Sequence, residues 1–452
     1  MVAHHTHVYR KVVREIAKAT VKPRLARNKD IASNFRALFA QSGRPEDTQR
    51  FHHDMQNALT FLRSQREYKA LLERYNPLID LTAEERIEAT ARRVAVSSSE
   101  TLTALHTAAS CLKDLSPVAF PTETVYGLGA IALNATAALK IFSTKGRPAD
   151  NPLIVHVSSR RMLQTLLPQN YTLSPSYELL IEHFWPGPLT LLFPCDHSLI
   201  PDIITAGQPT VAIRIPSHPV ARALIAVTDA PLAAPSANSS GKPSPTRAEH
   251  VLNDLNGKIT IILDGGPCEV GLESTVEDIK RVLVNGFSDT DTPIPQILVH
   301  RRDFRDDALE QAPTTPGMKY RHYSPSVPVT LMHMSEVPLG IEPLSPSAFL
   351  EDLKRSMPHS PNALRVGLLM PSDSILMKSL ISDTTIQWRE FPFGLVSEPA
   401  IIARRLFDGL LTLEREGVDL ILVEEVPEEN EGLAIMNRIK KAAGSSQWIA
   451  IP

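Results

Sequence analysis

The sequence has little of what marks a secreted or membrane-spanning protein. Its 452 residues hold three cysteines, which lie far apart and form no C-x-x-C pair, so neither a disulfide framework nor a cysteine zinc site is predicted. No run approaches the ~18 apolar residues that a membrane helix needs. The apolar segment of a signal peptide does not follow Met1. These absences predict a protein of a reducing compartment that makes no membrane contact.

Several common catalytic patterns are also missing. GLGAIA at residues 127–132 has the loose form G-x-G-x-x-A, but residues 121–126 separate it from the preceding apolar run, whereas a dinucleotide fingerprint follows its strand directly. A Walker A loop is absent because Gly241 and Lys242 are followed by Pro243. No Ser-His-Asp or paired-carboxylate pattern stands out, so covalent and glycosidase chemistry are not indicated.

The first 96 residues have no excess of acidic residues and few prolines. That segment holds 18 Lys and Arg against 11 Asp and Glu, while the remainder holds 29 against 39, which gives net charges of +7 and -10. It also contains only three of the 37 prolines. This asymmetry indicates two unlike proteins joined in one chain.

Residues 8–93 carry helical periodicity only. Between residues 9 and 62, apolar side chains recur at i, i+3 and i+4 in three stripes, and a capping box at residues 82–85 opens a fourth helix. Three or four such helices suffice for a small bundle. The basic residues 1–36 are either a face of this bundle or a mitochondrial transit peptide.

From residue 118 short apolar runs alternate with turn residues, which predicts a mixed α/β sheet. A helix at residues 101–112 precedes it. The predicted strands are residues 118–120, 152–157, 189–193, 211–215, 231–234, 259–263, 274–278 and 296–299. Residues 303–328 contain four prolines and have the composition of a linker. A last α/β unit is predicted to have strands at 366–370 and 420–423, a helix from residue 402 that ends at Gly417, and a closing helix at 433–443.

Polar residues within this region are candidates for a site. Lys145 and Arg147 end a predicted helix beside prolines, which indicates either a phosphate grip or a solvated surface pair. Residues 236–246 concentrate hydroxyl and amide groups, as in a ligand-binding loop or a set of capped turns. Arg214 interrupts an apolar strand, where a charge is costly unless an anion partners it. His156 lies in another such strand, a position typical of a core histidine.

Five motifs in this order resemble the threonylcarbamoyl-AMP synthase family, whose core has the YrdC-like fold. They are PTETVYGLGA at 121–130, KGRPADNPLIVH at 145–156, WPGPLT at 185–190, AAPSAN at 233–238 and ESTV at 273–276. TPGMKYRHYSP at 315–325 resembles the linker of two-domain members, and residues 340–452 resemble their second domain. The resemblance implies an α/β chain in which a YrdC-like mixed twisted sheet precedes a C-terminal Rossmann-like domain.

Members of this family make L-threonylcarbamoyladenylate and pyrophosphate from L-threonine, bicarbonate and ATP with Mg²⁺, and a separate complex transfers the threonylcarbamoyl group to a tRNA adenosine. The resemblance therefore implies a nucleotidyltransferase that positions its substrates and uses no protein nucleophile. By motif position, the residues implied to contact ATP are Lys145, Arg147, Asn151, Thr210, Ser236, Ser244, Arg301 and Tyr323. The residues implied to hold threonine are Thr124, His156, Arg214, Ala234 through its backbone, and Ser274.

Some of these assignments have further consequences. The threonine carboxylate would supply the anion that Arg214 needs in its strand. Tyr323 would fold over ATP, which makes the linker a lid. The sequence departs from the family after Arg301, where Arg302 and Asp303 replace the usual Pro-Gly.

The first 96 residues resemble a different family. Val8, Tyr9 and Arg10 are similar to the L-Y-R signature, and residues 26–39 and 73–77 are similar to the small fungal assembly factor for mitochondrial ATP synthase. This resemblance implies a helical module that binds a protein partner.

The predicted organisation is an N-terminal α-helical LYR-like segment at 1–96, a YrdC-like catalytic domain at 101–302, a linker at 303–339 and a Rossmann-like domain at 340–452. The predicted function is the synthase. The alternatives are an RNA-binding protein, which the charge of -10 disfavours, and an assembly factor acting through residues 1–96. A cytoplasmic location is predicted, with a mitochondrial one as the alternative.

Overall fold

The computed structural model describes residues 98–271, 276–288, 295, 322–335, 337–356, 363–429 and 431–451. The helices predicted within residues 8–93 and the strand predicted at 296–299 lie outside these residues. So do residues 303–321 of the linker, Ser274 and Arg301. Among the described residues, no helix combines the length and the apolar character that crossing a membrane requires.

The first part of the described chain is built on a seven-stranded sheet with the order β4-β5-β3-β6-β2-β1-β7. The strands are β1 Val118–Pro121, β2 Tyr126–Ile131, β3 Ile154–His156, β4 Leu191–Pro194, β5 Thr210–Arg214, β6 Leu232–Ala233 and β7 Ile261–Ile262. The β3–β5 and β1–β7 pairs are parallel and the other neighbouring pairs are antiparallel. The predicted mixed sheet is therefore confirmed, with β2 as a strand that the sequence pattern did not predict.

Helices cover both faces of this sheet. They are α5 Ser98–Lys113, α6 Ala135–Lys145, α7 Arg160–Gln164, α8 Pro175–Phe184, α9 Asp202–Thr205, α10 Pro219–Thr228, α11 Ala248–Leu255 and α12 Val276–Phe287. Val118 and Phe120 of β1 pack with α5 and α10, while Ala119 between them belongs to the core that α6 and α8 cover. Because successive side chains of a strand point to opposite faces, one short buried strand contributes to two apolar layers.

The glycine pair of residues 127–129 lies inside strand β2, which runs antiparallel to β1. A Cβ atom on Gly129 would lie 2.5 Å from Cε1 of Phe120, a buried ring with no room to move. Glycine here permits close strand packing. It forms no strand-to-helix turn, in agreement with the prediction that this segment is not a dinucleotide fingerprint.

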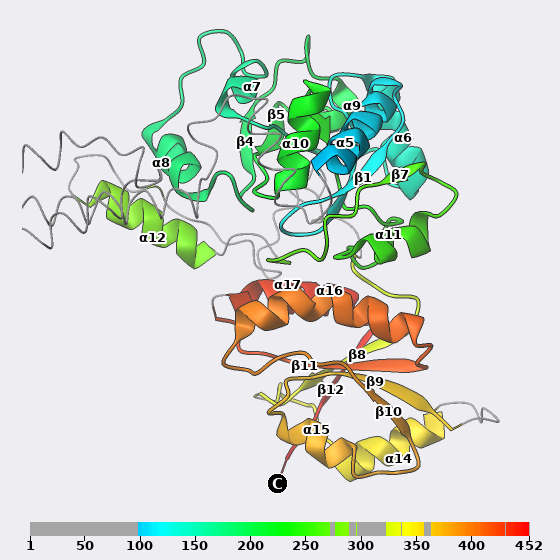
Figure 1. The fold of residues 1–452 in the computed structure, drawn as a ribbon. Coiled ribbons are helices and arrows are strands. Elements are labelled where there is room, and N and C mark those ends of the chain that lie inside the picture. The colour runs from blue at the N-terminus through cyan, green and yellow to red at the C-terminus, as the bar shows by residue number, and fades with distance from the viewer. Residues whose placement is uncertain are drawn as a thin grey trace, which may run out of the picture. The chain divides into compact units, whose positions relative to one another are not determined.

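A second sheet follows, with five parallel strands in the order β10-β9-β11-β8-β12. The strands are β8 Val329–His333, β9 Arg365–Leu369, β10 Gln387–Glu390, β11 Leu420–Glu424 and β12 Ser445–Trp448, and the helices are α14 Pro346–Ser356, α15 Ile375–Leu380, α16 Pro399–Arg415 and α17 Glu431–Ala442. Figure 1 shows α14 and α15 on one face and α16 and α17 on the other. This layering confirms the predicted Rossmann-like unit.

Strand β11 contributes side chains to both apolar layers of this second unit. Leu420 and Leu422 pack with α14 and α15, whereas Ile421 and Val423 pack with α16 and α17. A strand buried on both faces is a continuous apolar run, as its sequence predicted.

One predicted strand is wrong. Residues 276–278, the described part of the strand expected at 274–278, open helix α12. Ile279, Leu283 and Phe287 recur at the helical spacing of four, and they pack on the core that also contains Leu180 of α8. The β-branched residues at the start of this segment favoured a strand locally, but burial of the following helical stripe decides the structure.

Candidate active site

Arg147 is held by the chain segment that follows helix α6. Gly146 ends the helix with φ of 61°, a left-handed conformation that glycine adopts without strain. The Arg147 guanidinium then donates from Nε to the carbonyl of Asn151 at 3.2 Å and from Nη2 to the carbonyl of Pro152 at 2.9 Å. Burial lowers its pKa to about 10, against the opposing effects of Tyr323 and Asp150. Arg147 is therefore a fixed cation, which supports the phosphate grip over the solvated pair.

Lys145 joins the end of α6 to the loop at residues 236–246. Its Nζ donates to the backbone carbonyls of Ser236 and Asn238, and the residue is only 4% exposed. Burial and the neighbouring charge of Arg147 hold the pKa of Lys145 well below its usual range. The ammonium thus anchors the polar loop beside the Arg147 guanidinium.

Arg214 and His156 lie next to each other because β3 and β5 run parallel and place both residues at their carboxyl ends. The Nδ1 atom of His156 lies 3.2 Å from the carbonyl of Ile154. Burial and the charge of Arg214 lower the pKa of His156 to about 3, so its imidazole is neutral at physiological pH. His156 is only 3% exposed, as expected of a core histidine, and it also lines a cavity.

The anion beside Arg214 is Glu123 of the loop between β1 and β2. Nη2 of Arg214 donates to Oε1 of Glu123 and, at 3.2 Å, to Oγ1 of Thr124. Both members of the ion pair are buried, with exposures of 5% for Arg214 and 3% for Glu123. Sequence reasoning had assigned this neutralising role to a bound carboxylate, and the structure places a carboxylate of the chain there. The Nε–H of Arg214 is buried and has no hydrogen-bond partner.

One pocket brings most of the predicted site residues together. Of these residues, it is lined by Thr124, Lys145, Arg147, His156, Arg214, Ala234, Ser236, Ser244 and Tyr323. Asn151 and Thr210 are not among its lining residues. Asn151 is buried with its side-chain oxygen unpaired, and Thr210 begins β5, the strand that Arg214 ends. Ser274 and Arg301 lie outside the described residues.

The pocket also contains residues that sequence reasoning missed. His322, next to Tyr323, is one of them. Burial, together with the charges of Arg147, Lys441 and Lys145, lowers the pKa of His322 to about 4. Phe407 and Arg438 reach it from α16 and α17. The position of His322 inside a quoted motif was a usable signal. No local pattern distinguishes the other two, because they come from helices of the second sheet.

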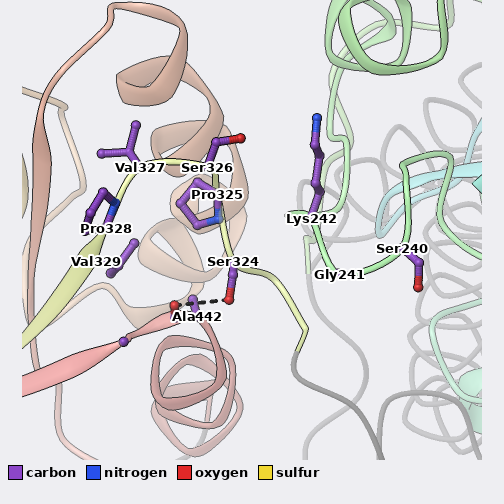
Figure 2. Close-up of a pocket in the computed structure, with 11 residues that line it drawn as sticks. Ser240, Gly241, Lys242, Ser324, Pro325, Ser326, Val327, Pro328, Val329 and Ala442 are labelled. Carbon is purple, nitrogen blue, oxygen red and sulfur yellow. Dashed lines mark hydrogen bonds between the residues drawn. The ribbon is translucent and has the colours of Figure 1, made fainter. Parts of the chain in front are cut away.

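The loop at residues 236–246 lines a second pocket as well (Figure 2). Ser240, Gly241 and Lys242 form one part of its lining, and residues 324–329 with Ala442 and Gly444 form the rest. The backbone N–H of Ser324 donates to the carbonyl of Gly241 at 2.9 Å. This loop therefore lines both pockets, and the Nδ2 group of Asn238 also stabilises its turn by donating to the carbonyls of Ser239 and Lys242.

The chemistry of the first pocket is that of an anion site. Arg147, the Glu123-paired Arg214 and the buried Lys145 contribute basic groups, and the neutral His156 adds a polar ring. Within the part of the chain that the structure describes, no three His, Cys, Asp or Glu side chains are grouped to hold a metal ion. The lining offers hydroxyls at Thr124 and Ser244 for neutral polar groups.

Three family descriptions match the chain. The Sua5, YciO and YrdC family, described as telomere recombination, matches residues 110–285, and the description "Threonylcarbamoyl-AMP synthase, C-terminal domain" matches residues 274–444. A Complex1_LYR-like family matches residues 6–97, in agreement with the predicted LYR-like segment, which lies outside the described residues.

Individual relatives that cover most of the chain support the first two family matches. The chain is 40% identical to the threonylcarbamoyl-AMP synthase of Schizosaccharomyces pombe over 395 residues, 78% of this chain and 91% of the relative, and 41% identical to that of Bacillus subtilis over 346 residues, 75% and 92% of the two chains. It resembles the crystal structure of P. abyssi Sua5 complexed with L-threonine, with 36% identity and a TM-score of 0.58 over 76% of this chain and 96% of that one. The resemblance predicted from the five motifs is thereby confirmed, and the chain belongs to the threonylcarbamoyl-AMP synthase family.

Proposed function

We propose that this protein makes L-threonylcarbamoyladenylate and pyrophosphate from L-threonine, bicarbonate and ATP, for the threonylcarbamoyladenosine modification of tRNA. The observation that carries the proposal is the grouping of Lys145, Arg147 and Arg214 around one pocket. Three basic side chains in a confined, partly desolvated site, one of them paired with Glu123, suit a substrate set that consists of a nucleoside triphosphate, a carboxylate and bicarbonate.

The threonine end of the site is assigned to the strand ends β3 and β5. The free Nε–H of Arg214 is a donor for the amino-acid carboxylate, and Thr124 and the neutral His156 offer polar contacts nearby. Ala234, whose backbone lies at the end of β6, and Ser274 complete the proposed set. The P. abyssi relative was crystallised in complex with L-threonine, which supports the assignment.

The nucleotide end is assigned to the segment after α6 and to the polar loop. Arg147 and Lys145 would meet the phosphates, with hydroxyls from Ser236 and Ser244 and the Tyr323 ring over the nucleotide. The remaining proposed contacts come from Asn151, Thr210 and Arg301. Mg²⁺ would enter with ATP, since phosphate oxygens are the hard ligands that this ion prefers.

The proposed reaction needs positioning and charge neutralisation in two steps. The threonine amine attacks the carbon of bicarbonate, and water leaves as a carbamate forms. A carbamate oxygen then attacks the α-phosphorus of ATP, and pyrophosphate leaves with the electron pair of the broken P–O bond. Arg147 and Lys145 would stabilise the negative charge that builds on the phosphates. The product is suited to transfer by a separate tRNA-modifying complex.

Pyrophosphate release by the purified full chain tests this function. We expect release with ATP, Mg²⁺, threonine and bicarbonate, and loss of release when threonine or bicarbonate is omitted. Release that ignores threonine would contradict the proposal. A tRNA affinity that falls steeply with salt, without threonine-dependent turnover, would instead favour the RNA-binding alternative.

A second role is proposed for residues 1–96. Their match to a Complex1_LYR-like family supports a module that binds a protein partner and a mitochondrial location for the chain as the alternative to the cytoplasm. Fractionation of cells that express the full chain, compared with a chain lacking residues 1–96, tests both points. A partner and a location that do not depend on this segment would refute this role.

A further inference from the structure

We propose that Glu123 is a positioning residue of the threonine site: its carboxylate holds the Arg214 guanidinium in the orientation that receives the carboxylate of the amino acid. This inference rests on the proposed function and adds a residue that contacts no substrate itself. Four observations lead to it, which concern the ion pair, the second oxygen of Glu123, the backbone of Glu123 and the unused donor of Arg214.

The ion pair is buried and spans distant parts of the sequence. Glu123 and Arg214 are 91 positions apart, and their side chains are 4% and 6% exposed. A buried ion pair is weak support for stability, because the cost of removing both charges from water offsets most of their attraction. A structural role alone would be met as well by an apolar pair of similar volume, so the charges call for another explanation.

Glu123 uses both carboxylate oxygens. Oε1 accepts from Nη2 of Arg214, and Oε2 accepts from the backbone N–H of Ser217 at 3.0 Å. Ser217 lies between β5 and α10, three residues after Arg214. The same carboxylate therefore fixes the guanidinium and the chain that leaves its strand, which leaves it no freedom to rotate.

The backbone of Glu123 is also fixed. Its carbonyl accepts from the N–H of Val270 at 2.8 Å. On either side of it, the hydroxyls of Thr122 and Thr124 lie 3.0 Å apart, and Oγ1 of Thr122 donates to the carbonyl of Val125 at 2.6 Å. A carboxylate on a tight and hydrogen-bonded loop is a rigid support for its partner.

Arg214 keeps a donor unused. Nη2 is occupied by Glu123 and Thr124, whereas Nε is buried without a partner beside a pocket that Arg214 lines. An unsatisfied N–H of a buried cation is costly, and a ligand oxygen would satisfy it. Because the ion pair already neutralises Arg214, an entering carboxylate adds one negative charge, which the amine of a zwitterionic amino acid balances.

The test measures the affinity of the full chain for two probes, L-threonine and L-threoninamide, by calorimetry. The second probe lacks the carboxylate and keeps the rest of the molecule. We expect Glu123→Gln to weaken threonine binding about tenfold or more, the size of a lost charge-assisted contact, and to leave L-threoninamide binding unchanged. The Michaelis constant for ATP should stay within about twofold of the parent value, since the phosphate groups are held elsewhere.

Two further variants control for folding. Glu123→Asp keeps the charge on a shorter side chain, and we expect a threonine affinity between those of the parent and Glu123→Gln, with near-normal thermal stability. If Glu123→Gln does not fold, this variant decides the matter through its ratio of threonine to threoninamide affinity. Glu424→Gln removes a buried carboxylate from the second sheet and should change neither affinity.

Distinct results would overturn the inference. Threonine binding that is unchanged or tighter in both Glu123 variants, or equal loss of threonine and threoninamide binding, would reduce Glu123 to a structural residue and leave the proposed function intact. A parent chain that binds no threonine would refute the proposed function and this inference together.

Discussion

The mixed sheet and the parallel sheet differ in how their charged side chains are partnered. In the mixed sheet these side chains lie around a pocket, whereas in the parallel sheet they form hydrogen bonds to residues of neighbouring loops and strand ends. Arg214 retains an unpaired donor beside the pocket. Glu425, which follows β11, instead accepts from Nδ1 of His333 at 2.6 Å and from the N–H of Met334 at 2.6 Å. Glu424 accepts from the hydroxyl of Ser374. Buried charge with unused hydrogen-bonding capacity indicates a ligand site, and buried charge bonded by its neighbours indicates structure.

Arg147→Ala gives the largest effect that this contrast predicts. The variant removes a fixed phosphate partner, so we expect kcat/KM for ATP to fall about 100-fold, the range seen for lost charge stabilisation in a site. The fold should survive because Arg147 is not part of an apolar core. Steady-state pyrophosphate release, with the melting temperature measured in parallel, checks this.

Arg281→Ala is the matched control for that variant. Arg281 lies on α12 with its side chain 69% exposed and paired to Asp278. We expect its kinetics to equal those of the parent chain. If the two alanine variants behave alike, the pocket cations are not ligand groups and the contrast between the sheets fails.

Glu424→Gln tests the structural side of the contrast through pH. Burial, with the charges of Asp373 and Glu425, raises the pKa of Glu424 to about 7. The unfolded carboxyl titrates near a pH of about 4.3, so the folded state loses stability as the pH rises from there to about 7, and the loss is then constant. Glutamine does not ionise, so the variant should gain stability relative to the parent at pH 8, by on the order of 3 to 4 kcal/mol.

Thermal melts of both chains at pH 5 and pH 8 measure this difference. We expect a small advantage of the variant at the lower pH and a much larger one at the higher pH. A parallel pH dependence in the two chains would show that Glu424 does not titrate with folding. Pyrophosphate release at one pH should be the same in both.

Lys354→Ala should give the smallest effect. Lys354 pairs with Asp383 at the surface of the second unit, with side-chain exposures of 40% and 19%. Exposed pairs contribute less than about 1 kcal/mol, because water and salt screen them. Chemical denaturation should place the variant within that margin, and a larger loss would mean that surface charges support this unit as strongly as buried ones.

Local sequence features predicted six of the seven described strands of the mixed sheet but only two of the five described strands of the parallel sheet. The apolar runs between turn residues located the strands from β1 to β7 apart from β2, and the continuous run at residues 420–423 located β11. These strands could be predicted because a buried strand is itself a short apolar run bounded by turn residues, which is visible in the local sequence. The strand predicted at 274–278 was wrong because β-branched residues stand where a helical apolar stripe begins. The packing of that stripe on the core with α8 favours the helix. The predicted domain boundaries stay predictions.

The site was partly predictable for a similar reason. Lys145, Arg147 and Thr124 stand in dense motifs, and the structure brings them to one pocket. Phe407 and Arg438 could not be found, because each is an ordinary residue of an amphipathic helix until the fold places it at the cavity.

The sequence by itself determined which side chains could serve a site, since residue type sets charge, hydrogen-bonding capacity and the local choice of strand or helix. Only the tertiary structure decided the partner of each one. The need of Arg214 for an anion was inferred correctly, but Glu123 was not identified as its partner within the chain, because Glu123 lies 91 residues away and meets Arg214 only when the β1–β2 loop folds against the end of β5. Electrostatic energy depends on distance in space, and separation along the chain does not report that distance.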